Sequence, residues 1–276
     1  MAFLERLARR LPAIGDDAAV VQAPAGPLLL AADALVEGVH ADLSVTTAAD
    51  FGWKALAVNV SDIAAMGGRP LHALVTVVVP PGRGPDLEAL YEGLLEASAA
   101  FGCAVVGGDL SAGPALTVSV AVTGTVDDGG PGPVLRSGAR PGDALWVTGP
   151  LGAAARDLEA RRAGRAHARP EPRLVEGGAA RWAGATAMLD LSDGLVLDLR
   201  RLAVASGVGV VVDDVPVAGG ATLDQALAGG DDYELLAASP VPLAGWHRVG
   251  HCTADPGERR LGESPLPEGG WSHVWS

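Results

Sequence analysis

The sequence DFGWKALAVNVSDIAAMGGRPLHALVTVVV (residues 50–79) contains the signals of a helix and a strand in direct succession. Residues 50–66 have the pattern of a helix with small residues on several faces, and Gly67, Gly68 and Pro70 predict where it ends. The remainder, LHALVTVVV (71–79), is rich in strand-forming residues. This alternation, in a chain dense in Gly and Pro, indicates an α/β protein.

Further strand and helix signals flank this segment. LLLAAD (28–33) predicts a short buried strand. Residues 86–102 repeat apolar residues at a helical period and end at a glycine, which predicts a helix. CAVVGG (103–108) and ALTVSVAVTGTV (115–126) are predicted strands, the second with clear alternation.

The turn-rich sequence DDGGPGP (127–133) is the best candidate for a domain boundary. We expect two α/β domains, at residues 1–137 and 138–276. The strands expected in the second domain are ALWVTG (144–149), MLDL (188–191), GVVVDD (209–214) and YELLAA (233–238). The helices expected there lie within 151–164, 172–184 and 194–207, and residues 160–173 are expected to form an exposed, solvated connection.

The composition limits the classes of protein to which this chain can belong. A chain of 276 residues that is 49% hydrophobic can fill the cores of two domains. Its formal net charge of −13 argues against nucleic-acid binding, which needs a cationic surface. No apolar run approaches the roughly 18–20 residues that a membrane-spanning helix needs, so we expect no membrane partner and, by default, a cytoplasmic location. Cys103 and Cys252 are expected to be reduced thiols.

The basic residues limit how this chain can bind phosphate. Only Lys54 among the 20 basic residues is a lysine, and no glycine-rich loop precedes it, which excludes a Walker-type phosphate loop. In a protein this acidic, a divalent cation is the natural bridge between carboxylates and phosphates.

Aspartates recur beside glycines and after apolar runs. A single such aspartate is more often a turn or a helix cap, but the set carries more weight. Asp33, Asp109 and Asp190 each follow an apolar run, as a carboxylate at the end of a strand would. Asp62 lies in the predicted helix with Asn59 three residues before it, so this helix either faces water or carries polar groups into a site. Because magnesium is commonly held by a few carboxylates and substrate phosphates, the set predicts magnesium ions on a polyphosphate.

These motifs, in this order, resemble the thiamine-monophosphate kinase family over about residues 14–237. The segment KALAVNVSDIAAMGGRP (54–70) and the run RSGARPGD (136–143) are the most specific. The other motifs that carry the resemblance are GDDAAV, DALVEGVH, VVGGDLS, DLSDGL and GGDDYEL. The resemblance implies an α/β (α+β) fold like that of aminoimidazole-ribonucleotide synthetase. It has an N-terminal sheet domain that binds ATP and magnesium and forms a homodimer, and a C-terminal α/β domain.

The resemblance also implies roles for individual residues. The magnesium ligands would be Asp17, Asp33, Asp62, Asp109, Asp190 and Asp193. The contacts to ATP would be Gly108, Asp109, Arg136 and Ser192. The contacts to thiamine monophosphate would be His40, Asp231 and Trp275, with Trp271 as the alternative aromatic residue. Lys54 is expected only as a helix-surface residue.

The expected reaction is transfer of a phosphoryl group from ATP to thiamine monophosphate. The nucleophile is a phosphate oxygen that is already deprotonated, so no general base is needed, and the main obstacle is repulsion between two polyanions. The chain departs from the family at Ala31 and Ala32, where Ser-Thr is usual, and at Asp231, where the family has glutamate. Two alternatives stay open: another ATP-using enzyme of the superfamily, and a nucleotide-binding regulator or inactive paralogue.

Overall fold

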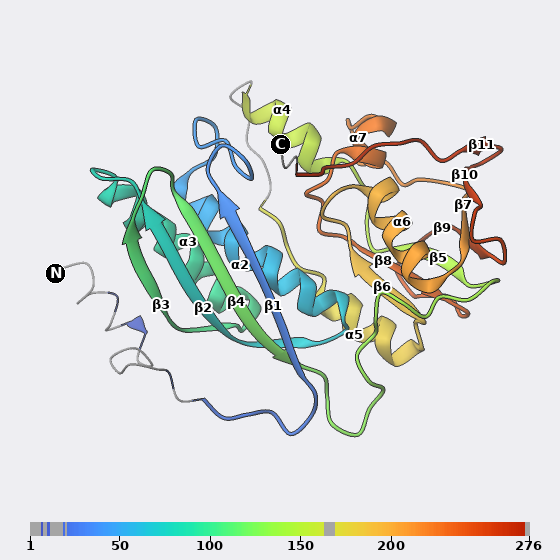
Figure 1. The fold of residues 1–276 in the computed structure, drawn as a ribbon, viewed down its shortest axis with the longest axis horizontal. Coiled ribbons are helices and arrows are strands. Elements are labelled where there is room, and N and C mark those ends of the chain that lie inside the picture. Colours follow the sequence, from blue (N-terminus) through green and yellow to red (C-terminus); the bar gives the residue numbers. More distant parts are fainter. Residues whose placement is uncertain (1–6, 8–9, 12–18, 20, 163–168, 274–276) are drawn as a thin grey trace. The chain divides into compact units, whose positions relative to one another are not determined.

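The computed structural model describes residues 7, 10–11, 19, 21–162 and 169–273 (Figure 1). The chain forms two compact units. The first consists of Met1–Ile63 and Arg69–Asp128, and the second consists of Ala64–Gly68 and Gly129–Ser276.

The first unit is built on a four-stranded sheet with the strand order β1-β4-β2-β3. The strands are β1 (Leu28–Val36), β2 (Arg69–Val79), β3 (Ala104–Ala112) and β4 (Thr117–Thr125). Strands β1 and β2 run antiparallel to β4, whereas β2 and β3 are parallel and are joined through a helix. The helices α2 (Ala48–Ala65) and α3 (Gly84–Phe101) both lie on one face of the sheet (Figure 1).

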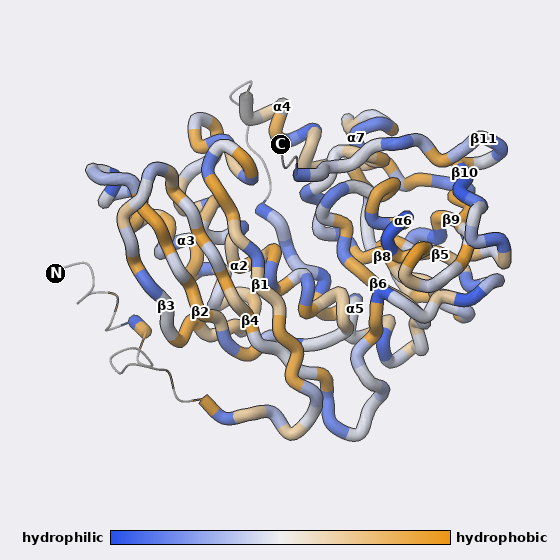
Figure 2. Tube along the Cα trace, viewed as in Figure 1, coloured by the Kyte–Doolittle hydropathy of each residue, from blue (hydrophilic) through white to orange (hydrophobic). Residues whose placement is uncertain are grey.

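Alternation along the strands explains this packing. In β2, Ala73, Val75 and Val77 are buried, while Leu74 and Thr76 between them are exposed. Apolar residues nevertheless recur along β1, β2 and β4 (Figure 2), because apolar side chains stand on the open face as well. Leu30 of β1 is 71% exposed and Leu74 is 50% exposed.

The two helices cross at glycines, which lets their backbones approach closely. A Cβ atom on Gly52 of α2 would lie 2.0 Å from the carbonyl oxygen of Leu90. A Cβ atom on Gly93 of α3 would lie 1.8 Å from the carbonyl oxygen of Ala49. No side chain fits at either position unless the helices separate.

The second unit contains a seven-stranded sheet with the order β11-β10-β7-β9-β5-β8-β6. All pairs are antiparallel except β10 with β7. The strands are β5 (Ala144–Val147), β6 (Ala187–Asp190), β7 (Gly209–Val212), β8 (Leu235–Ser239), β9 (His247–Thr253), β10 (Arg259–Leu261) and β11 (Ser264–Pro265). The helices are α4 (Ala153–Arg162), α5 (Leu174–Ala183), α6 (Leu195–Ser206) and α7 (Leu223–Ala228).

Strands β6 and β8 of this second sheet are buried along their whole length. Leu236 and Ala238 of β8 join the larger core, to which α6 and α7 contribute. Leu235 and Ala237 point the opposite way, into a smaller core with Ala180 of α5 and the end of α2. Two cores on opposite sides of one sheet explain why these strands read as continuous apolar runs.

The expected α/β class is confirmed, and most elements lie where the sequence predicts them. Three expectations are wrong in detail. Strand β1 is longer than predicted and is not buried, since only Leu29 and Leu35 in it are buried. Asp33 and Asp109 do not follow strands but lie inside β1 and β3. Helix α7 and strands β9–β11 were not predicted from the sequence. Cys103 and Cys252 are free and buried, and burial raises the pKa of each thiol to about 12. Within the described residues, no helix is both long enough and apolar enough to cross a membrane.

The crossing of α2 and α3 gives a testable prediction. Gly93→Ala should lower the free energy of unfolding by at least about 2 kcal/mol, because the new methyl group overlaps a backbone oxygen. Gly178→Ala, the same change inside α5 where a Cβ meets no atom within 4 Å, should instead raise it by about 0.4–1 kcal/mol. Denaturant titrations of the two variants would measure both changes, and equal midpoints would contradict the close crossing.

Candidate active site

In the first unit, Asn59 of α2 ties that helix to the middle of β1. Its side-chain Oδ1 accepts a hydrogen bond from the Asp33 backbone N–H at 2.9 Å, and its Nδ2 donates to the Ala55 carbonyl at 2.9 Å. Asn59 is 1% exposed, whereas Asp62 is half-buried and Asp33 is exposed. Asn59 is therefore a structural bridge that fixes the strand segment of Asp33 to the helix that carries Asp62.

His40 lies in the tight turn that follows β1. Its backbone N–H donates to the Val36 carbonyl at 2.9 Å, and the Val36 N–H donates to its ring Nδ1 at 3.0 Å. Gly38 makes this turn possible with a φ of 81°. Lys54 Nζ donates to the His40 carbonyl at 2.9 Å, so this lysine has a structural contact that the sequence analysis missed.

Gly108 and Asp109 lie on β3, opposite β2. Gly108 has a φ of 154°, and a Cβ there would lie 1.8 Å from the Val75 carbonyl oxygen, so only glycine fits. The Asp109 carboxylate is exposed and accepts a hydrogen bond from Ser111 Oγ at 3.1 Å. Burial, with a contribution from the negative charge of Asp109, raises the pKa of Tyr91 to about 12.

In the second unit, Asp190 ends β6 as predicted and is 8% exposed. The loop after it is bonded to the segment before β8. The Leu191 N–H donates to the Glu234 carbonyl at 2.8 Å, and the Asp231 N–H donates to the Ser192 carbonyl at 2.8 Å. These bonds bring the loop of Asp190, Ser192 and Asp193 beside the loop of Asp231.

Two residues that the sequence analysis missed hold Asp193. The buried carboxylate of Asp198 accepts the Asp193 N–H at 2.9 Å, and Arg201 Nη1 donates to Asp198 Oδ1 at 2.6 Å and also to the Asp193 carboxylate. Burial is the main cause that raises the pKa of Asp198. The i, i+3 spacing of Asp198 and Arg201 on a predicted helix is the signal that could have found this pair.

Asp231 is held in a strained conformation. It has a φ of 63° and Tyr233 has a φ of 50°, a region that non-glycine residues seldom adopt and that is often found at functional sites. Tyr233 Oη donates to Asp231 Oδ1 at 3.1 Å. The Asp232 carboxylate accepts hydrogen bonds from the N–H groups of Gly152 and Ala154 at the start of α4. Burial raises the pKa of Asp232 to about 6.

Glu234 anchors the same loop through a buried ion pair. Arg173 donates to both carboxylate oxygens of Glu234, at 2.9 and 2.5 Å, and Thr148 Oγ1 donates to one of them. Glu234 is 5% exposed. The expectation that residues 160–173 form a solvated connection is therefore wrong for Arg173, because its charge compensates a buried carboxylate.

Other predicted residues are not placed in these two groups. Arg136 is exposed, and its carbonyl oxygen accepts a hydrogen bond from Ser206 Oγ at 3.4 Å. Asp17 and Trp275 lie outside the described residues. Among the residues that the structure describes, no three histidine, cysteine or acidic side chains are gathered as ligands of one metal ion.

The oxygen donors that are present suit magnesium, which prefers carboxylates and retains several water molecules. Asp33 and Asp109 offer exposed carboxylates, and Asp62 and Asp193 offer partly exposed ones. Because magnesium usually takes one or two carboxylates together with substrate phosphates, individual carboxylates of this kind fit it without a preformed cage.

Comparisons with known proteins identify the family. Residues 15–126 match the family model described as AIR synthase related protein, N-terminal domain. The thiamine-monophosphate kinase of Mycobacterium tuberculosis (strain H37Rv) is 37% identical, over 98% of this chain and 90% of that protein. The enzyme of the same name from Bacillus subtilis (strain 168) is 36% identical, over 80% of this chain and 75% of that protein.

Solved structures agree with this assignment. Thiamine-monophosphate kinase from Stenotrophomonas maltophilia K279a superposes with a TM-score of 0.83 at 32% identity, over 97% of each chain. AaThiL complexed with AMPPCP and TMP superposes with a TM-score of 0.82 at 31% identity, over 99% of this chain and 96% of that one. The predicted aminoimidazole-ribonucleotide-synthetase-like fold is thereby confirmed. From the family motifs, this fold and an identity that extends over nearly its whole length, it follows that the chain belongs to the thiamine-monophosphate kinase family.

Proposed function

We propose that this chain is a thiamine-monophosphate kinase, which transfers the terminal phosphoryl group of ATP to the phosphate of thiamine monophosphate. The products are thiamine diphosphate and ADP. The observation that carries the proposal is the relative AaThiL, which superposes on 99% of this chain and was captured with AMPPCP and TMP together.

The chemistry requires positioning and charge neutralisation more than acid or base catalysis. The attacking oxygen belongs to a phosphate that is already anionic near neutral pH, so no catalytic base is assigned. Bound magnesium would supply the positive charge that lets the two phosphate groups approach each other. The residues that we propose as its ligands are Asp17, Asp33, Asp62, Asp109, Asp190 and Asp193.

The chain's own contacts order the main chain at two of these aspartates, Asp33 and Asp193, before a cation binds. Asn59 fixes the Asp33 segment to α2, and Asp198 with Arg201 fixes Asp193. A carboxylate held in advance does not have to be ordered when the cation arrives, which lowers the entropic cost of binding.

We propose Gly108, Asp109, Arg136 and Ser192 as ATP contacts, and His40, Asp231 and Trp275 as contacts to thiamine monophosphate. Two of these proposals have support in local geometry. Gly108 is exposed on β3, so a phosphate can reach its backbone, and Asp231, in its left-handed conformation, has an exposed carboxylate beside the Asp193 loop.

We propose a cytoplasmic homodimer in which the open face of the first sheet packs against a second copy of this chain. The register of the strands places exposed Ala32 of β1 beside exposed Ala121 of β4, which in turn lies beside Leu74 of β2. Together with Leu30, these residues form an apolar surface on a sheet face, of the kind that marks an interface.

The first prediction of the proposed function concerns the reaction. A coupled ADP-release assay should show turnover with thiamine monophosphate that requires magnesium, and little turnover with unphosphorylated thiamine, because thiamine lacks the anionic nucleophile. ATP binding without ADP release would instead support the nucleotide-binding regulator that Ala31 and Ala32 leave open.

The second prediction concerns the aspartates. Asp62→Asn and Asp193→Asn should each lower kcat by at least about 100-fold, because an amide binds a cation much more weakly than a carboxylate does. Asp224→Asn, at an exposed position in α7, is the matched control and should keep full activity. Near-normal rates in both site variants, with unchanged circular dichroism, would refute the assignment of metal ligands.

The third prediction concerns assembly. Leu30→Lys and Leu74→Lys should each convert a dimer into a monomer in light scattering, because a lysine ammonium would have to be desolvated at the interface. Val204→Lys, at an apolar position on α6 that is 74% exposed, should leave the mass unchanged. A wild-type protein that is monomeric at micromolar concentration would contradict the proposed dimer.

A further inference from the structure

The turn that carries His40 is fixed by hydrogen bonds to Val36 and Lys54, and also by bonds to Leu116, the residue just before β4. His40 itself is bonded to Val36 through both its backbone N–H and its ring, and to Lys54 through its carbonyl. A neutral imidazole that accepts a hydrogen bond at Nδ1 carries its proton on Nε2. The turn therefore sets the tautomer of His40 as well as its direction.

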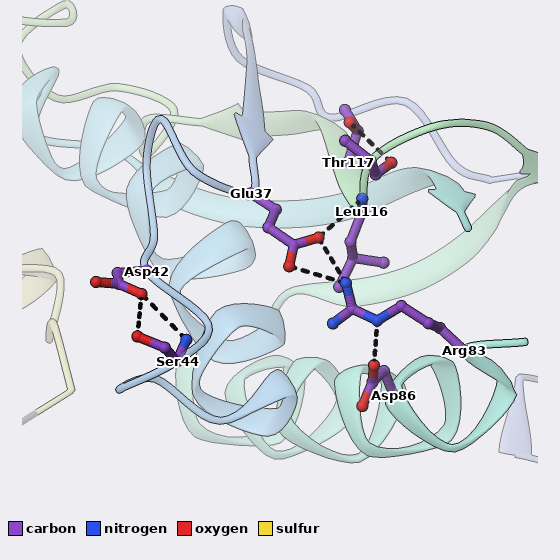
Figure 3. A network of polar contacts seen from close by, with 8 residues as sticks. Glu37, Asp42, Ser44, Arg83, Asp86, Leu116 and Thr117 are labelled. Carbon is purple, nitrogen blue, oxygen red and sulfur yellow. Dashed lines mark hydrogen bonds and ion pairs between the residues drawn. The ribbon is translucent and has the colours of Figure 1, made fainter. Parts of the chain in front are cut away.

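Glu37, three residues earlier, joins this turn to β4. Its backbone N–H donates to the Leu116 carbonyl at 2.9 Å, and the Leu116 N–H donates back to Glu37 Oε2 at 3.2 Å. This pair of bonds fixes both the main chain and the side chain of Glu37. Both oxygens of the same carboxylate accept hydrogen bonds from Arg83 (Figure 3).

Arg83 connects Glu37 to a third segment. Its Nη1 donates to both carboxylate oxygens of Glu37, at 2.8 and 2.7 Å, and its Nε donates to Asp86 Oδ2 at 2.5 Å (Figure 3). Glu37 is 27% exposed and Arg83 is 31% exposed, so water screens this pair less than it screens a fully exposed pair. The planar guanidinium thus links the His40 turn to the start of α3.

We propose that Glu37 and Arg83 are positioning residues that hold the His40 turn in the geometry that binds the phosphate acceptor. This inference rests on the proposed function, in which His40 contacts thiamine monophosphate. Loss of the ion pair would free the turn to sample other conformations, and the competent fraction would fall. A smaller competent fraction weakens the apparent affinity for the acceptor and leaves bound complexes able to react.

The test compares kcat and KM for each substrate in four variants. Glu37→Gln and Arg83→Gln should raise the KM for thiamine monophosphate about tenfold, equivalent to about 1.4 kcal/mol, with kcat and the KM for ATP within about twofold of wild type. Arg83→Lys should give an intermediate KM, because an ammonium keeps the charge but cannot hold Glu37 and Asp86 with one planar fork. The matched control is Glu92→Gln. Glu92 lies on α3 and forms an exposed ion pair with Arg10, so its substitution should leave kcat and both KM values unchanged.

Calorimetric titration with thiamine monophosphate in the absence of ATP gives a second measure that does not depend on turnover. In the Glu37 and Arg83 variants, the dissociation constant of thiamine monophosphate should rise together with the KM for the same substrate. If Glu37→Gln reduces the folded fraction, Arg83→Gln and Arg83→Lys decide the case on their own. Acceptor KM values equal to that of Glu92→Gln, or equal losses in kcat and in both KM values, would overturn the inference.

One further variant distinguishes a failure of the positioning role from a failure of the proposed function. His40→Asn should raise the acceptor KM at least as much as Glu37→Gln does. A rise with His40→Asn and none with Glu37→Gln overturns the positioning role alone. A wild-type protein that does not phosphorylate thiamine monophosphate overturns the proposed function and the inference together.

Discussion

Carboxylates that lie close together repel one another, and the contacts of this chain hold aspartates of the candidate site in place against that repulsion. At a separation of 4 Å, two like charges repel by about 4 kcal/mol at the effective dielectric constant of a protein surface. In each unit, considered by itself, an aspartate segment is held by neighbours that are not themselves proposed as ligands. Asn59 holds the Asp33 segment, and Asp198 with Arg201 holds Asp193.

Arginines hold Asp193 and also carboxylates that are not proposed ligands, such as Glu37 and Glu234. Arg83, Arg173 and Arg201 each bind a carboxylate that is partly or fully buried, and Arg83 and Arg201 bridge two carboxylates. The guanidinium suits this role because its charge is permanent and its donors form a fixed planar fork. A chain with a net charge of −13 thus uses several of its arginines to hold carboxylates, and in the proposed reaction divalent ions would neutralise the substrate.

The sequence predicted elements better than it predicted contacts. Helix α2 was predictable because small residues, a glycine pair and Pro70 mark its face and its end. Strands β1 and β3 run past Asp33 and Asp109 because pairing with β4 and β2 satisfies their backbones, a tertiary effect that local pattern does not record. Strand β9, with the sequence HRVGHCT, carries too few apolar residues to give a strand signal. The Arg173–Glu234 pair joins residues 61 positions apart, so no local spacing could reveal it.

The geometry of β1 bears on the Ala31-Ala32 departure from the family pattern. Strand β1 is at the edge of the four-stranded sheet and pairs only with β4. In an antiparallel ladder the N–H and C=O of one residue point to the same side, and that side alternates along the strand. The Asp33 N–H is bonded to the Asn59 side chain and so points away from β4, which places the carbonyls of Asp33 and Ala31 on the free edge of β1. Substitution of the family's hydroxyl residues by alanine therefore leaves main-chain oxygens beside the Asp33 carboxylate, and carbonyl oxygens are accepted ligands of hard cations. This arrangement favours a modified metal site over a lost one.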